Sequence, residues 1–242
     1  MVGFDLDLTL VDSAEGIART LRAALAEDPA GTAPTDEVLR PYVGIPLELT
    51  VRAVAPGADV DRVAIRYREL YPAMGVPATT LLPGVHETFA AIRARGGRVL
   101  VVSAKVEPAV HAVLEQVGLS GPGAGPDVVV GGLYAGAKGV RLRAEGAHVY
   151  VGDHPGDMEA AAVAGTVAVA VGTGSTPAAG LMAAGADVVL PDLRAFPGWF
   201  ATWLEGWDGS APPGARLHDE AGERDAEPDR AQQGERREAA GS

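Results

Sequence analysis

The chain has 242 residues, 47% hydrophobic and 21% charged, which is typical of a globular protein with enough apolar side chain for a sizeable core. The formal net charge of −12 argues against nucleic acid as a partner, because binding a phosphate backbone needs a basic surface. A small anionic ligand in an enclosed site is compatible with this net charge. The absence of cysteine excludes disulfides, thiolate catalysis and thiolate metal sites.

The N-terminal residues do not resemble a targeting segment. Asp5, Asp7 and Asp12 stand where a signal peptide would have basic and then unbroken apolar residues. No apolar run reaches the roughly 18 residues that a membrane span needs. We therefore expect a cytoplasmic protein without a membrane partner.

The first predicted strand covers residues 2–6, a short apolar run that leads directly into polar residues. Five further valine-rich runs predict strands at residues 98–102, 127–130, 148–151, 167–171 and 187–190. Their apolar residues are mostly continuous, which is typical of a sheet covered on both faces. Helical patterns between the runs predict right-handed crossovers, and thus an α/β fold with a doubly wound, mainly parallel sheet.

Residues 14–82 interrupt this alternation and show no convincing strand. Apolar residues recur there at helical spacing: Ile17, Leu21, Leu25, Val63, Tyr67, Leu70 and Tyr71. Several prolines divide the segment into short helices. We therefore expect a small all-helical insert after the first strand.

The last stretch with a core-forming pattern is aromatic, and it contains Phe196, Trp199, Phe200 and Trp203. These side chains predict a final short helix packed against the sheet. Residues 208–242 have almost nothing to bury, so we expect them to be disordered.

The strongest functional signal is the motif Asp5-x-Asp7-x-Thr9 at the end of the first strand. Open α/β sheets bind ligands at the carboxyl ends of their strands. One carboxylate can attack a phosphoryl group while a second, protonated carboxyl donates a proton to the leaving group. The alternative is a helix-capping acidic loop, since Asp12 and Glu15 have capping-box spacing.

A second acidic motif, Gly152-Asp153-x-x-x-Asp157, follows the strand at residues 148–151. Hard oxygen ligands of this kind suit Mg²⁺, which prefers one or two carboxylates together with water and substrate phosphate. His154 lies within this motif, and we interpret it as a loop residue.

Ser103, Ala104 and Lys105 follow the strand at residues 98–102. A hydroxyl and a backbone N–H at this position can hold phosphate oxygens, although a serine after a strand is also a common helix cap. Lys105 and Lys138 are the only lysines. Either ammonium would neutralise a nucleophilic carboxylate, and the sequence leaves the choice between them open.

Taken in order, these motifs resemble the haloacid dehalogenase superfamily, specifically its phosphoglycolate-phosphatase-like members with a small helical cap. The resemblance covers residues 2–205. It implies a Rossmann-like catalytic core formed by residues 1–13 and 83–207, and a cap formed by residues 14–82 that closes over the site. Residues 208–242 lie outside it.

The resemblance also implies roles for the charged residues of the motifs. Asp5 would be the nucleophile that forms an aspartyl-phosphate, and Asp7 would protonate the leaving alkoxide and then activate water. Asp5, the backbone carbonyl of Asp7 and Asp153 would hold Mg²⁺, with Asp157 as a ligand or close by. Lys138 would neutralise the transferring phosphoryl group.

The smaller motif residues would bind the phosphate. Thr9 would steady its loop, and Ser103 and the backbone at Ala104 would contact phosphoryl oxygens. The chain departs from the family pattern in two places, because Ala104 stands where Asn is frequent and Gly139 replaces the proline that usually follows the lysine. Gly44 lies where relatives have a glycine-containing substrate loop.

The expected function is Mg²⁺-dependent hydrolysis of a phosphate monoester of a small phosphorylated metabolite. One alternative is a phosphomutase of the same superfamily acting on a sugar phosphate, with cap contacts from Arg40, Arg52, Arg66 and Arg68. Another is a non-catalytic binding protein on the same fold. A dehalogenase is disfavoured, because Asp7 has no clear use in halide displacement. The substrate and the oligomeric state stay open.

Overall fold

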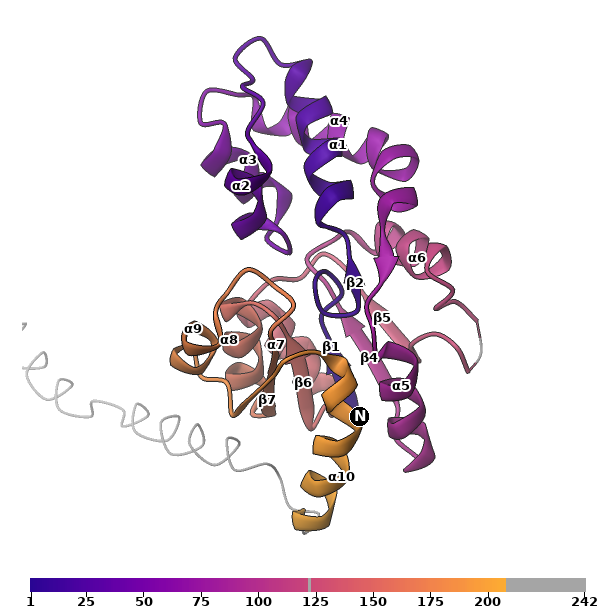
Figure 1. Ribbon diagram of the computed structural model, residues 1–242. Coiled ribbons are helices and arrows are strands. Elements are labelled where there is room, and N and C mark those ends of the chain that lie inside the picture. Colours follow the sequence, from indigo (N-terminus) through magenta and orange to yellow (C-terminus); the bar gives the residue numbers. More distant parts are fainter. Residues whose placement is uncertain (122, 208–242) are drawn as a thin grey trace, which may run out of the picture.

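The computed structural model describes residues 1–121 and 123–207, and its centre is a six-stranded parallel sheet (Figure 1). The strand order is β5-β4-β1-β6-β7-β8. The strands are β1 (Val2–Phe4), β4 (Val99–Val102), β5 (Val128–Val130), β6 (Val149–Gly152), β7 (Val167–Val171) and β8 (Val188–Leu190). All six predicted strands are confirmed, and the predicted disordered tail at 208–242 lies outside the described residues.

Helices cover both faces of this sheet (Figure 1). One face packs against α5 (Val85–Ala94), α6 (Glu107–Gln116) and α10 (Phe196–Gly206). The other packs against α7 (Gly136–Ala144), α8 (Pro155–Ala164) and α9 (Ala178–Ala183). Successive residues of a strand point to opposite faces, so Val101 belongs to the first core and its neighbour Leu100 to the second. The doubly wound α/β fold is therefore confirmed.

Four helices lie between the two halves of the core sequence and form a hydrophobic cluster of their own. They are α1 (Ala14–Ala26), α2 (Asp36–Leu39), α3 (Leu47–Val54) and α4 (Val60–Met74). Short 3₁₀ turns occur at Arg40–Tyr42, Val76–Ala78 and Leu193–Ala195. This helical group lies beyond the carboxyl ends of the central strands (Figure 1). Its status as a separate cap domain stays a prediction.

Two short antiparallel strands, β2 (Val11–Asp12) and β3 (Thr80–Leu81), pair where the chain enters and leaves the helical group. The expectation that residues 14–82 contain no strand was therefore wrong at β3. A two-residue strand is too short to show a periodic pattern in the sequence. Within the described part of the chain, no helix has the length and apolar character required to cross a membrane.

Candidate active site

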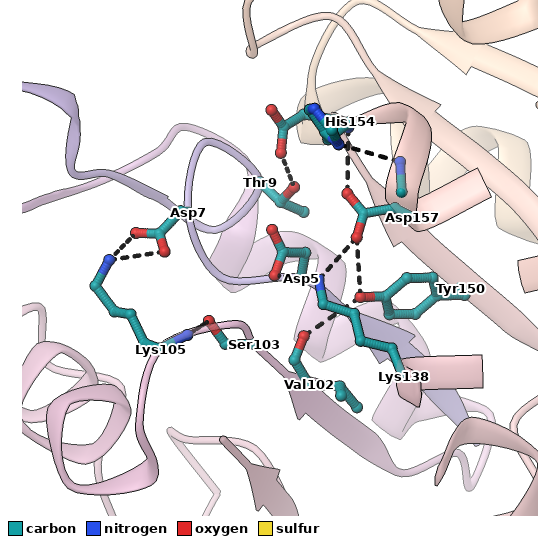
Figure 2. Close-up of polar contacts among 12 residues, drawn as sticks. Asp5, Asp7, Thr9, Val102, Ser103, Lys105, Lys138, Tyr150, His154 and Asp157 are labelled. Carbon is teal, nitrogen blue, oxygen red and sulfur yellow. Dashed lines mark hydrogen bonds and ion pairs between the residues drawn. The ribbon is translucent and has the colours of Figure 1, made fainter. Parts of the chain in front are cut away.

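Asp5 lies immediately beyond β1 and is fixed to the neighbouring strand, because its N–H donates to the carbonyl of Val151 at 2.9 Å. Lys138, in the first turn of α7, extends its ammonium toward the same point. Its Nζ donates to Asp5 Oδ1 at 2.8 Å and to Asp157 Oδ1 at 2.8 Å (Figure 2). All three side chains are buried. Of the two lysines, Lys138 is therefore the one that pairs with Asp5.

Asp5, Asp153 and Asp157 form a compact acidic group in which one carboxylate oxygen of each lies within 4.8 Å of the others. The Thr9 hydroxyl donates to Asp153 Oδ1 at 3.0 Å, and this hydrogen bond orients the Asp153 carboxylate. The Lys138 ammonium pairs with Asp5 and Asp157, so the three carboxylates together leave an excess of two negative charges when all are ionised. Hard oxygen donors with this charge fit Mg²⁺.

Burial and mutual repulsion make the acidic group costly to ionise without a cation. The pKa of Asp5 is raised to about 7, mainly by burial; the Lys138 charge opposes this rise, and the charges of Asp157 and Asp7 add to it. Burial also raises the pKa of Asp153 well above its usual range. For Lys138, burial lowers the pKa, but the Asp157 and Asp5 carboxylates outweigh it, so the ammonium stays charged.

A second layer of contacts orients Asp157. The Tyr150 hydroxyl lies 3.2 Å from Asp157 Oδ1 and 3.3 Å from the carbonyl of Val102, and the His154 N–H donates to Asp157 Oδ2 at 3.2 Å. His154 caps α8, because its Nδ1 accepts from the N–H of Gly156. Tyr150 was not predicted as a site residue, because it lies within an apolar strand, where an aromatic side chain is expected to belong to the hydrophobic core.

Asp7 has different partners, although it is only two residues from Asp5. Lys105 Nζ donates to Asp7 Oδ1 at 2.6 Å and to Oδ2 at 2.7 Å (Figure 2). The Ser13 hydroxyl also donates to Asp7 Oδ1. Between the aspartates and β2 the chain turns tightly, with Leu8 at a φ of 55° and Leu10 N–H donating to the Leu6 carbonyl. The Asp7 side chain is outside the acidic group among the described residues, so only its backbone carbonyl stays a predicted metal ligand.

The residues predicted to bind phosphate lie around these aspartates. Ser103 follows β4, is buried, and its hydroxyl accepts from the N–H of Lys105 at 3.2 Å. Thr9 is engaged with Asp153, and Ala104 lies between Ser103 and Lys105 at the edge of a cavity. Their contacts with phosphate stay predictions.

The cavity has a volume of about 350 Å³ and lies between the helical group and the core. Asp7, Gly44 and Lys105 line it. Gly44 has a φ of +85°, and a Cβ added there would lie 3.9 Å from Asp5 Oδ2 and 4.0 Å from Asp7 Cβ. The loop of the helical group that carries Gly44 therefore lies directly over both aspartates, as a glycine-containing substrate loop would.

The two arginines of α4 that the sequence suggested as substrate contacts have acidic partners. Arg66 pairs with Glu27 at 2.8 Å and with Glu69 at 3.0 Å. Arg68 pairs with Glu48, and both of these residues line the cavity. Arg68 is therefore better placed than Arg66 to contact a ligand in the cavity.

The family model described as haloacid dehalogenase-like hydrolase matches residues 2–162. A phosphoglycolate phosphatase from Rhodospirillum rubrum is 32% identical over 230 residues, which cover 85% of this chain and 92% of that protein. A tyrosine-protein kinase, PtkA, from Mycobacterium tuberculosis is 32% identical over 186 residues. That match covers 72% of this chain but only 62% of the kinase, so the chain spans less than two thirds of this relative.

Solved structures of lower identity share the fold. A haloacid dehalogenase-like family hydrolase from Streptococcus pneumoniae superposes with a TM-score of 0.70 at 20% identity, covering 82% of this chain and 97% of that one. A structure assigned as a β-phosphoglucomutase from Thermotoga maritima gives a TM-score of 0.60 at 18% identity, covering 83% and 98%.

Proposed function

This chain belongs to the haloacid dehalogenase-like hydrolase family, and we propose that it is a Mg²⁺-dependent phosphatase that hydrolyses phosphate monoesters of small molecules. The observation that carries the proposal is the buried group of Asp5, Asp153 and Asp157, in which Lys138 pairs with the first and the last. The phosphoglycolate phosphatase relative, matched over nearly its whole length, supports the same reaction class.

In the first step, an Asp5 carboxylate oxygen attacks phosphorus, and the bond between phosphorus and the leaving oxygen breaks. Asp7 donates a proton to that oxygen, so the leaving group departs as an alcohol. In the second step, Asp7 takes a proton from water, which attacks the aspartyl-phosphate. Inorganic phosphate leaves, and Asp5 is regenerated.

The remaining charges hold the phosphoryl group in place. Lys138 lies against Asp5 and offsets the repulsion between its carboxylate and a phosphate dianion. Asp5, Asp153 and Asp157, with the backbone carbonyl of Asp7, would hold Mg²⁺, which supplies further charge neutralisation and in-line orientation.

Lys105 Nζ and the Ser13 hydroxyl both donate hydrogen bonds to the Asp7 carboxylate. They hold it at the cavity wall, where both proton transfers of the proposed mechanism would take place.

The test is release of inorganic phosphate from a generic aryl phosphate, with and without Mg²⁺. We expect Asp5→Asn to abolish turnover, because an amide is a poor nucleophile toward phosphorus. Asp12→Asn is the matched control, because Asp12 is an exposed aspartate of β2, close to Asp7 in the sequence, and should retain activity. Equal rates for wild type and Asp5→Asn would reject the proposal.

A phosphomutase would protect the aspartyl-phosphate from water and hold a sugar phosphate through cap cations. The Glu partners of Arg66 and Arg68 weigh against such contacts. Interconversion of sugar-phosphate isomers with little phosphate release would favour the mutase.

Transfer of phosphate to tyrosine would instead match the name of the mycobacterial relative. Residues 14–82 as a closing cap and a cytoplasmic location remain part of the proposal.

A further inference from the structure

We propose that the leaving group of the natural substrate is an apolar or aromatic group without a carboxylate, and that it fills the cavity beside Asp7. This inference rests on the proposed function, which places the phosphoryl group at Asp5. It differs from the small, anionic leaving group that the phosphoglycolate phosphatase relative would release.

The position of the cavity assigns it to the leaving group. A general acid must contact the oxygen that it protonates, and Asp7 is the proposed acid. Asp7 lines the cavity, whereas Asp5, Asp153 and Asp157 are absent from its lining among the described residues. The phosphoryl group would therefore lie at the acidic group, and the rest of the substrate would extend past Asp7 into the cavity.

The walls of the cavity are mainly apolar or aromatic. The helical group contributes most of them, among them Ile17, Leu21, Tyr42, Ile45, Tyr67 and Tyr71. On the side of the core, α6 contributes Ala109 and Ala112, whose small side chains leave room. A cavity of about 350 Å³ is at the lower end of the range for small-molecule sites, which fits a compact aromatic ring or a short alkyl chain.

The charges at the cavity wall already have partners. Four charged side chains line it among the described residues, and they form the pairs Lys105–Asp7 and Arg68–Glu48. A carboxylate on the leaving group would either stay unpaired in apolar surroundings or displace Asp7 or Glu48 from its cation. An unpaired carboxylate in apolar surroundings is costly, and so is displacing Asp7 from Lys105, because both of these side chains are largely buried. The Arg68–Glu48 pair is more exposed, so Glu48 is the easier of the two to displace.

Tyr71 adds one specific polar position. Its side chain lines the cavity and is 2% exposed, and its hydroxyl makes no hydrogen bond of good geometry within the described residues, although the Lys105 and Thr79 side chains lie near it. Buried polar atoms are normally satisfied, so we expect one polar atom of the leaving group to contact this hydroxyl.

The test uses alkylphosphonates, which mimic phosphate monoesters but cannot be hydrolysed, so binding is measured apart from turnover. Dissociation constants of methyl-, butyl-, hexyl- and benzylphosphonate would be measured by calorimetry with Mg²⁺, together with carboxymethylphosphonate. We expect affinity to rise about fourfold per methylene until the cavity is full, since ~0.8 kcal/mol per methylene converts at about 1.4 kcal/mol per tenfold. Equal affinities across the series, or tightest binding of carboxymethylphosphonate, would overturn the proposal.

Two pairs of variants sharpen this test. Ala112→Phe fills the cavity and should abolish the gain from methyl to hexyl, whereas His111→Phe, on the exposed side of the same helix, should preserve it. Glu48→Gln releases Arg68 and should strengthen binding of carboxymethylphosphonate several-fold. Glu27→Gln removes one of the two acidic partners of Arg66, outside this cavity, and should leave that affinity unchanged.

The two proposals can fail separately. If affinity rises with chain length but butyl and phenyl phosphate release no inorganic phosphate, the ligand class is supported and the phosphatase proposal is rejected. If inorganic phosphate is released but the phosphonates bind without regard to chain length, the phosphatase proposal stands and the apolar leaving group is rejected.

Discussion

Lys138 Nζ and Asp5 Oδ1 lie 2.8 Å apart, although 133 residues separate them in the chain. The parallel sheet creates this contact. β1 pairs with β6, and α7 leads into β6, so the first turn of α7 is brought beside the residue that follows β1. The side chains are 2% and 4% exposed, which means that water contributes little to stabilising either charge.

Replacing Lys138 should therefore destabilise the fold as well as abolish activity. Lys138→Met leaves Asp5 and Asp157 without their cation, and removing one partner of a buried ion pair costs about 3–5 kcal/mol. Thermal unfolding without metal would show a lower Tm than wild type, and Mg²⁺ should restore part of the loss. Lys105→Met is the control, because it leaves only Asp7 unpaired and should cost less. Equal Tm values for wild type and Lys138→Met would contradict this account.

The strands and the order of the motifs could be predicted from the sequence, because both depend on local patterns. A run such as Val99–Val102 is continuous and apolar only when both faces are covered, and the acids follow directly at strand ends. The choice between Lys105 and Lys138 could not be predicted. Lys105 meets Asp7 across 98 residues and Lys138 meets Asp5 across 133, and only the strand order decides which lysine reaches which aspartate.

Two features were hidden for other reasons. Tyr150 supports the acidic group through its hydroxyl, but its ring makes it indistinguishable from a core residue of β6. The cavity is lined by residues from α1, α3, α4 and α6 and from the loop that carries Gly44, and no single one of these elements reveals it in the sequence. Whether the apolar side chains of these elements pack together or leave a cavity depends on how the helical group is placed against the core.

The stability of the metal-free protein should depend on pH through Asp5. Burial raises the pKa of Asp5 to about 7, whereas an unfolded chain has an aspartate pKa of about 3.9. Between these values the folded protein binds more protons than the unfolded chain, so the free energy of unfolding falls as the pH rises. Above pH 7 this contribution becomes constant.

Urea unfolding in a chelator, between about pH 5 and pH 8, measures this effect. Asp5→Asn removes the titrating group, so the variant should lose less stability than wild type over that range. Excess Mg²⁺ should reduce the difference, because a bound cation favours ionised carboxylates. A wild-type stability that rises between pH 5 and pH 7 relative to the variant would contradict the assignment.

Tyr150 should tune metal affinity without touching the metal. Its hydroxyl lies 3.2 Å from Asp157 Oδ1, and loss of such a supporting contact typically weakens metal binding about 10-fold or more. Mg²⁺ titration of Tyr150→Phe by calorimetry would measure this change. Tyr134→Phe is the control, because the Tyr134 ring packs against His154. If Tyr150→Phe binds Mg²⁺ as tightly as wild type, the hydroxyl has no part in orienting Asp157.

Gly139 allows α7 and α8 to approach closely, which in turn positions Lys138. A Cβ at Gly139 would lie 2.5 Å from the carbonyl oxygen of Ala160 and 2.6 Å from Val163 Cβ. Gly139→Ala should therefore push the helices apart and destabilise the protein by about 1–3 kcal/mol, in spite of the higher helix propensity of alanine. Gly198→Ala in α10 is the matched control, because nothing lies within 4 Å of its added Cβ, and it should be neutral or stabilising by up to about 1 kcal/mol. Denaturant unfolding of both variants measures the contrast. If Gly139→Ala is as stable as Gly198→Ala, the close approach of the helices is not what requires glycine beside Lys138.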